Sequence, residues 1–236
     1  MKRLITILVF FITLNGFSQY FAPPGATWYY SFSTTFFDGY IKFSFENDTT
    51  ILGIEAQKLA RYSASYNWAT GWFFPESFTG YEYTYADQDH VYQLIGDEFK
   101  LLYDFTVQPN DTILIYSSEF YDWTNECDSV GRAIVTETGT VIINGLELRW
   151  YKIASLEEST YILNGKIVER IGNTTGSLFS LPSDCIYIQE LIGQFFRCYE
   201  DEDFPQYKPY SGECDFVNGI EELKNDQNLF SFYPNP

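Results

Sequence analysis

Aromatic side chains are the most concentrated groups in this sequence that could bind a ligand. They make up 20% of its 236 residues, and one stretch gathers several of them around Gly71 and Pro75: Tyr62, Tyr66, Trp68, Trp72, Phe73 and Phe74. Gly and Pro favour a loop there. Exposed Trp and Tyr rings on a rigid β scaffold stack on sugar rings or anchor a protein partner, whereas the alternative is burial in the core of an all-β domain. Our candidate ligand-binding residues are Tyr66, Trp68, Trp72 and Phe74.

Carboxylates could support a different chemistry, because the chain holds 32 Asp and Glu residues. A glycosidase needs only two of them, an acid and a base or nucleophile about 5 to 9 Å apart. Clusters stand at Asp87/Asp89, Asp97/Glu98 and Glu200–Asp203, and spacing does not select a pair among them. The last cluster lacks the register of a calcium-binding loop, so we interpret it as solvated surface charge. A secreted carbohydrate-active hydrolase is therefore an alternative hypothesis.

Other catalytic arrangements lack their residues. The single His, His90, excludes multi-His metal centres and is the one histidine available to a Ser/His/Asp triad. A lone His beside a turn is more often a surface residue. The sequence has no nucleophile-elbow, zinc-protease, dinucleotide-binding or P-loop motif, and no Lys follows the glycine-rich residues 172–177. We predict no cofactor and no metal site. We prefer a non-catalytic protein to an enzyme.

Charge narrows the choice of partner. The net charge is -18 and the isoelectric point is about 4.2. Phosphate groups are bound by clustered Lys and Arg, so we expect neither nucleic acid nor an anionic membrane as partner. The hydrophobic fraction of 45% is that of a globular protein.

The first residues have the three-part layout of a secretory signal peptide. Lys2 and Arg3 precede the apolar run Leu4–Leu14, and a short polar stretch follows. This run is about half of the roughly 20 residues that span a bilayer, and no later segment approaches that length. We predict that residues 1–19 are a signal peptide, that the protein is secreted or displayed on the outer cell surface, and that the mature chain has no membrane span. Cleavage removes two cations and no acid, which changes the net charge from -18 to -20.

Export to an oxidising compartment would favour disulfides among the four cysteines. Cys127, Cys185, Cys198 and Cys214 are an even number, and none of them forms a C-x-x-C pair. An oxidising compartment favours two disulfides. We prefer Cys198 with Cys214, which closes a loop of 15 residues, and assign Cys127 to Cys185 by default; the other two pairings stay open.

Period-2 alternation and turn residues dominate the body of the chain, and helical periodicity is scarce. The strongest hairpin signals are Asn144–Gly145 and Asn164–Gly165. Turn signals also stand at Asp38–Gly39, Asn47–Asp48 and Gly96–Asp97. We predict strands over 28–33, 40–45, 81–85, 91–95, 100–105, 112–116, 132–136, 140–143, 147–154, 160–163, 166–170 and 194–199. The expected fold is all-β: a single antiparallel β-sandwich or flattened barrel of ten or more strands, over residues 20–218.

The C-terminal end changes in character. Residues 219–228 are polar and read as a linker. Residues 229–236 end in Tyr233-Pro234-Asn235-Pro236 and resemble the start of the C-terminal sorting domain carried by cargo of the type IX secretion system of Bacteroidota. The sequence stops where the rest of that domain would follow. If the full sorting domain exists, the resemblance implies the type IX secretion machinery as a partner.

A second resemblance covers about half of the body. Segments such as Leu101–Phe105, Glu169–Gly172 and the Cys198/Cys214 pair are similar to those of uncharacterised secreted Bacteroidota proteins with that sorting domain. Where those proteins usually have Gly, this chain has Arg170. The resemblance implies a secreted or surface-displayed β protein and no particular activity.

Three hypotheses follow for the function. The first, which we prefer, is a non-catalytic secreted or cell-surface β module that binds or adheres through its aromatic-rich loop, with a glycan or a surface protein as partner. The second is the hydrolase described above. The third is a structural protein of the cell envelope.

Overall fold

The protein is built from β-strands. The computed structural model describes residues 21–116, 130–156, 159, 164–179 and 192–217, and these residues form thirteen strands and no helix. The strands are β1 (Thr27–Ser33), β2 (Phe37–Ile51), β3 (Ile54–Asn67), β4 (Trp72–Ala86), β5 (His90–Ile95), β6 (Glu98–Asp104), β7 (Thr112–Tyr116), β8 (Val130–Ile143), β9 (Leu146–Ser155), β10 (Gly165–Val168), β11 (Gly172–Asn173), β12 (Ile192–Asp201) and β13 (Phe204–Tyr207). The predicted all-β class is confirmed.

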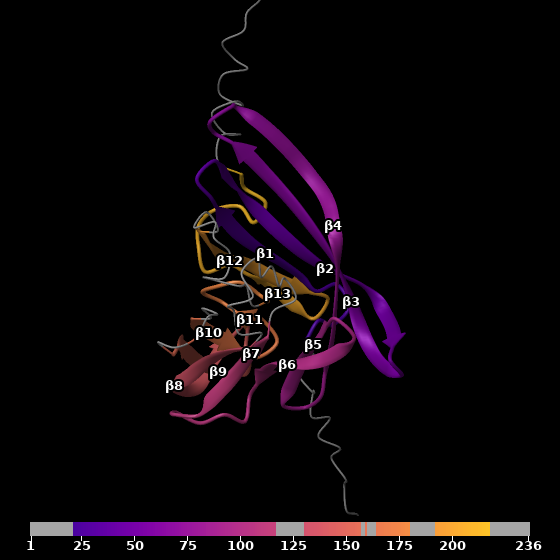
Figure 1. Ribbon diagram of the computed structural model, residues 1–236, viewed down its shortest axis with the longest axis vertical. Coiled ribbons are helices and arrows are strands. Elements are labelled where there is room, and N and C mark those ends of the chain that lie inside the picture. The colour runs from indigo at the N-terminus through magenta and orange to yellow at the C-terminus, as the bar shows by residue number, and fades with distance from the viewer. Residues whose placement is uncertain (1–20, 117–129, 157–158, 160–163, 180–191, 218–236) are drawn as a thin grey trace, which may run out of the picture.

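The strands form two antiparallel sheets that lie against each other (Figure 1). The larger sheet has eight strands in the order β13-β12-β1-β2-β3-β4-β5-β6, and the smaller has five in the order β11-β10-β9-β8-β7. Most neighbours in each sheet are consecutive in the chain, as expected of hairpin-connected strands. The exception is β12, which returns from the far end of the chain to pair with β1. This arrangement confirms a sandwich-like fold of more than ten strands.

One hydrophobic core fills the space between the sheets. It combines Trp28, Tyr30 and Leu59 of the large sheet with Leu148 and Ile167 of the small one, all fully buried. Hydrogen bonds from polar atoms of aromatic rings cross this core, as buried Trp and Tyr require. The Trp28 Nε1–H donates to the carbonyl of Ile171 at 2.8 Å, and the Tyr30 hydroxyl donates to that of Asn173 at 2.8 Å. These bonds fix how the sheets lie on each other.

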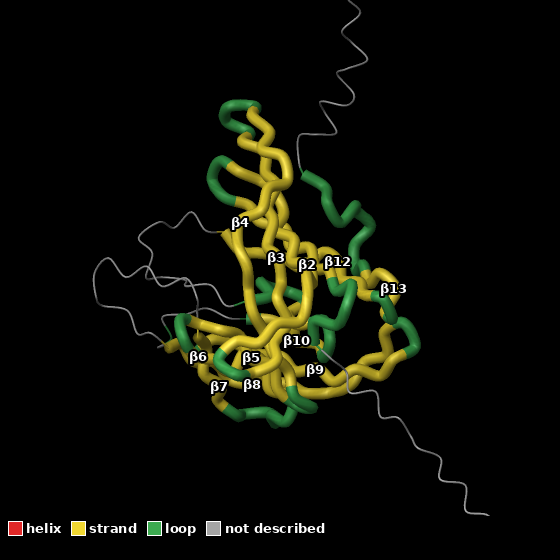
Figure 2. The backbone as a smooth tube through the Cα atoms, turned by 90° about the vertical axis from the view of Figure 1, so that its right-hand side faces the viewer, coloured by secondary structure: helices red, strands yellow, loops and turns green. Residues whose placement is uncertain are grey.

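Three strands of the large sheet are much longer than the other strands of that sheet. β2, β3 and β4 have 15, 14 and 15 residues, which corresponds to roughly 45–50 Å each. Their upper parts project beyond the five-stranded sheet (Figures 1 and 2). In β4, all residues from Trp72 to Thr79 are exposed. The described pairing of β4 with β5 covers Thr84–Ala86 alone, so among the described residues the upper part of β4 is an edge strand.

Some predicted turns are present in the structure and one is not. Asn144 and Gly145 both have positive φ values, 52° and 82°, and join β8 to β9 as predicted. Leu52 and Gly53 make an equivalent turn, with φ values of 55° and 80°. The turn predicted at Asn47–Asp48 is wrong: β2 continues to Ile51 and has a register shift between Phe45 and Asn47. There the polar residues form a β-bulge instead of a chain reversal.

The preferred disulfide is present. Cys198 of β12 is bonded to Cys214, with the two Cα atoms 5.7 Å apart. Cys127 and Cys185 lie outside the described residues, as do the predicted signal peptide, linker, sorting motif and the strand predicted over 160–163. Within the described ranges, no helix has the length and apolarity needed to cross a bilayer.

Candidate functional site

The predicted aromatic residues gather at the free end of the long strands. We call this group the aromatic tip: Phe36, Phe37, Tyr66, Trp68, Trp72, Phe73 and Phe74. The two indoles are its most exposed members, Trp68 at 55% and Trp72 at 68%. The expectation that the stretch forms a loop is wrong for most of it, because the connection covers only residues 68–71 and the other members of the stretch lie in β3 and β4. Trp68 is the candidate that stands in the loop itself.

Tyr66 packs against a small buried cluster around Tyr40, and local contacts hold the rest of the tip in place. The Asn67 Oδ1 accepts hydrogen bonds from the backbone N–H groups of residues 69 and 70, each at 3.0 Å. Gly71 adopts a φ of 73°, which glycine reaches without strain. The Phe36 ring lies 6.0 Å from the Trp68 ring, and the Phe37 ring lies 6.0 Å from that of Phe74. The rings therefore pack against one another and keep their outer faces in water.

A second aromatic group continues from the tip along β4, on the sheet face that points away from the core. We call it the aromatic ladder: Tyr62, Phe78, Tyr81 and Tyr83. Successive ring centroids lie 5.8, 4.7 and 6.4 Å apart. The intervening residues Glu82 and Thr84 face inward and are 9% and 0% exposed. The usual polarity of a half-buried strand, apolar in and polar out, is thus reversed in β4.

Charged groups border the ladder. The Lys58 ammonium lies 3.6 Å from the centroid of the Tyr81 ring, and the Lys42 ammonium lies 4.7 Å from that of Tyr62. Lys42 also pairs with Glu76, which accepts a hydrogen bond from the Tyr40 hydroxyl at 2.9 Å. Burial and this hydrogen bond to Glu76 raise the pKa of Tyr40. The face therefore combines flat apolar rings with donors and acceptors at their edges.

A groove of about 590 Å³ lies near the tip, between β1, β2 and β12 on one side and the disulfide-linked loop on the other. Its aromatic lining residues are Phe32, Phe195, Phe196, Tyr210 and Phe216. The Arg197 guanidinium holds the loop wall by donating to the carbonyls of Cys214 and Phe216, and it donates to that of Gly39 across the sheet at 3.2 Å. The groove is thus fixed by a disulfide and by a partly buried arginine.

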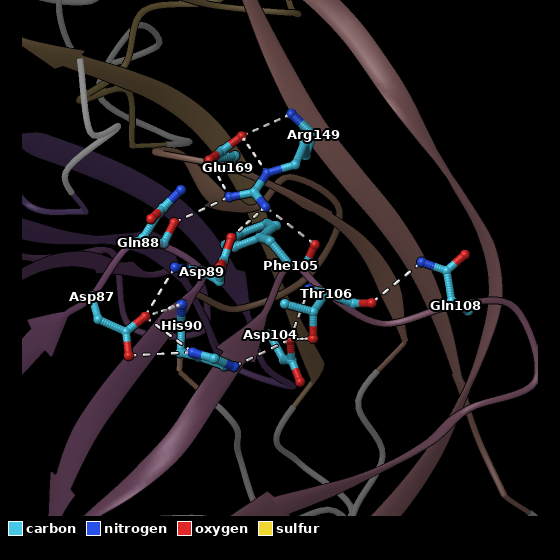
Figure 3. A network of polar contacts seen from close by, with 10 residues as sticks. All are labelled: Asp87, Gln88, Asp89, His90, Asp104, Phe105, Thr106, Gln108, Arg149 and Glu169. Carbon is cyan, nitrogen blue, oxygen red and sulfur yellow. Dashed lines mark hydrogen bonds and ion pairs between the residues drawn. The ribbon is translucent and has the colours of Figure 1, made fainter. Parts of the chain in front are cut away.

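The polar network around Arg149 joins the two sheets (Figure 3). Arg149 of β9 donates to Glu169 at 2.7 and 3.1 Å, and to Asp89 in the β4–β5 turn at 2.7 Å. His90 belongs to the same region, where its ring nitrogens lie 3.0 Å from Asp87 Oδ1 and 3.6 Å from Asp104 Oδ1. The two ring nitrogens thus face two carboxylates, whereas a triad histidine turns one of them toward a serine hydroxyl.

Removing Arg149 should therefore loosen the contact between the sheets. We expect Arg149→Ala to lower the free energy of unfolding by about 2 kcal/mol, because it leaves the buried Glu169 carboxylate without its cation. Urea denaturation at pH 7 measures this. As a control, Lys152→Ala removes a partner from the exposed pair with Glu137 and should cost roughly 0.5 kcal/mol or less. Equal effects of the two substitutions would contradict the assigned role.

The carboxylates are arranged for ion pairing. Hydrogen bonds from the Asp89 and His90 backbone lower the pKa of Asp87, and the hydrogen bond with Lys100 lowers that of Glu98. Asp201 belongs to the acidic run interpreted as solvated charge, but its side chain is 1% exposed and paired with Arg170, so that interpretation is wrong at this position. A glycosidase acid needs a raised pKa, whereas these shifts are downward. The described residues hold no group of three or more His, Cys, Asp or Glu placed to bind a metal.

Comparison with known proteins adds no assignment. No family model, no curated protein and no solved structure matches this chain.

Proposed function

We propose that this protein is a secreted or cell-surface binding module, without catalytic activity, that adheres through the aromatic tip and the aromatic ladder. The observation that carries the proposal is the reversed polarity of β4. Phe78 and Tyr81 are exposed and Tyr83 is partly exposed, while Glu82 and Thr84 occupy the inward positions. Large aromatic rings left in water do not contribute to the core, and exposed apolar groups of this size mark binding surfaces.

A glycan chain fits this surface better than the alternatives. Sugar rings present flat C–H faces and hydroxyl edges, which match rings bordered by the ion pairs of Lys42 with Glu76 and Lys58 with Glu46. The net charge of -18 disfavours polyanionic partners. Export is supported by the N-terminal sequence and by the Cys198–Cys214 disulfide, which is typical of oxidising compartments.

The test is binding of the purified chain and of Trp68→Ala/Trp72→Ala to an array of neutral glycans and to insoluble polysaccharides. We expect the double variant to bind at least about fivefold more weakly, since each of the two lost ring contacts is worth about 0.5–1.5 kcal/mol. Its unfolding free energy should change by no more than about 0.5 kcal/mol, because neither ring supports the core. The matched control is Leu52→Ala/Ile142→Ala, which removes two exposed apolar side chains elsewhere.

Two outcomes would contradict the proposal. One is glycan binding that survives in the tip variant but not in the control. The other is the absence of glycan binding together with pull-down of a defined envelope protein, which would favour the structural role. Among the described residues, no observation favours the hydrolase over these functions.

A further inference from the structure

Three buried polar atoms without hydrogen-bond partners lie in one row across the large sheet. They are Gln57 Oε1, Thr84 Oγ1 and Gln93 Oε1, on side chains that are 6%, 0% and 1% exposed. Gln57 is directly opposite Thr84 in the β3–β4 ladder, and Thr84 is opposite Gln93 in the β4–β5 ladder. A buried polar atom left unpaired costs about 1–3 kcal/mol. Of the three, Gln57 alone borders a cavity, so its oxygen is the one that a ligand could reach.

A cavity of about 530 Å³ opens at the Gln57 end of this row. It lies between the segment Ala22–Pro24 and the end of the β2–β3 hairpin, and its other lining residues are Asp48, Thr49, Thr50, Glu55, Gln57 and Ala86. Asp48 is paired with Gln57 in the sheet, and Thr50 with Glu55. Directly opposed residues point to the same face, so the two carboxylates and the Gln57 amide share one wall.

The residues that line this cavity include two carboxylates and no cationic side chain. Asp48 and Glu55 accept hydrogen bonds only, the unpaired atom of Gln57 is an acceptor, and no Lys, Arg or His is among the residues that line the cavity. Pro23 and Pro24 form the opposite wall and have no N–H to donate. The volume lies within the range of small-ligand pockets. The side-chain donors among the lining residues are the hydroxyls of Thr49 and Thr50 and the Gln57 amide, and none of them carries a positive charge. A cationic donor group supplies that charge to the two carboxylates.

We propose that this cavity binds a protonated amine or guanidinium group, either of a free polyamine or of a Lys or Arg side chain on a partner peptide. The cation enters between Asp48 and Glu55, and its N–H groups donate to these carboxylates and to Gln57 Oε1. The site is separate from the aromatic tip, because Gln57 and Asn67 are ten residues apart on β3, or roughly 33 Å. It therefore does not rest on the proposed glycan binding.

The test is calorimetric titration of the purified full chain with spermidine and with an acetylated peptide that contains one Lys, at low and at physiological salt. A peptide with norleucine in place of Lys is the neutral control. We expect saturable binding of at least one amine and none of the norleucine peptide. Binding of spermidine or of the Lys peptide supports the same chemistry, and their relative affinities identify the source.

Two variants locate the site. Asp48→Asn/Glu55→Gln should weaken amine binding by about tenfold or more. Glu137→Gln/Glu213→Gln changes the net charge equally in β8 and in the disulfide-linked loop, outside the residues that line the cavity, and should leave amine binding nearly unchanged. Gln57→Met removes the unpaired amide at similar volume; we expect weaker binding with unchanged or higher thermal stability. Equal losses in the two charge variants, or no saturable binding, would overturn the proposal. The Trp68→Ala/Trp72→Ala variant should bind amines normally, so the two proposals can fail independently.

Discussion

Replacing Arg170 by alanine is expected to lower the free energy of unfolding by about 3–5 kcal/mol, because the substitution leaves a carboxylate buried without its cation. Arg170 donates to Asp201 through Nε at 2.7 Å and Nη2 at 2.5 Å, and Tyr199 donates its hydroxyl to the same carboxylate. The Asp201 side chain is 1% exposed and that of Arg170 is 10% exposed. Water therefore replaces little of what the variant loses.

The effect of Arg170→Ala should depend on pH. Burial raises the pKa of Asp201, but hydrogen bonds from Arg170, Tyr199 and the Asp203 N–H outweigh it, so that the pKa lies below its ordinary value. A lowered pKa in the folded state stabilises the protein above the unfolded pKa of about 3.9, and this contribution disappears as pH falls through the folded value. Without Arg170 burial dominates, and Asp201 takes up a proton at higher pH.

Urea denaturation at pH 7 and near pH 3.5 measures both predictions. The difference between the natural chain and Arg170→Ala should be largest at pH 7 and should shrink at the lower pH. Lys100→Ala, which breaks the exposed pair with Glu98, is the control and should change little at either pH. A loss below about 1 kcal/mol at pH 7 would show that the Arg170 pair is not the buried ion pair described above.

Removing the Cys198–Cys214 disulfide should lower the free energy of unfolding by about 3 kcal/mol, because the two cysteines are 16 positions apart and the bond restricts the unfolded chain. The double variant Cys198→Ala/Cys214→Ala leaves no single thiol of this pair, and denaturation in urea gives the difference. Tyr210→Ala, an exposed substitution within the same loop, is the control and should stay within about 0.5 kcal/mol. A double variant as stable as the control would mean that the Arg197 contacts fix the loop by themselves.

The strands and several turns follow from the sequence because they depend on neighbouring residues. Alternation and the Asn144–Gly145 pair act over a few positions, and both were confirmed. The loop predicted for the aromatic stretch is wrong for most of it, because Gly71 and Pro75 are residues typical of loops. Pro75 instead lies at a register shift of β4 opposite Ser63–Ser65, on an edge where its missing N–H is tolerated.

Which face of β4 turns inward was beyond sequence reasoning. Successive residues of a strand point to opposite faces, so Glu82 and Thr84 lie on the face opposite to the tyrosines. Hydrophobicity alone would place the tyrosines on the inner face. Glu82 can face inward because Gln93 donates to it at 3.0 Å and Arg61 lies 3.5 Å away. Those partners come from other strands, and their proximity depends on the register of the folded sheet.

Arg170 depends both on its local backbone conformation and on a contact with a residue distant in the sequence. Its φ of 68° lies in the left-handed region that favours glycine. An arginine there costs about 1–2 kcal/mol of backbone strain, and the reason for accepting it is Asp201, which lies 31 positions later. The network of Arg149 has the same character, since Asp89 is 60 positions away. Such pairs have no local signal in the sequence.

The unpaired margin of β4 has a consequence for solubility. Uncovered strand edges recruit other chains, and fibril-forming segments are typically six or seven residues long. Register shifts interrupt β4 between Phe74 and Ser77 and again between Phe78 and Gly80. Each regular run along this edge of β4 is therefore shorter than such a segment. The exposed aromatic side chains can then stay in water without promoting cross-β polymerisation.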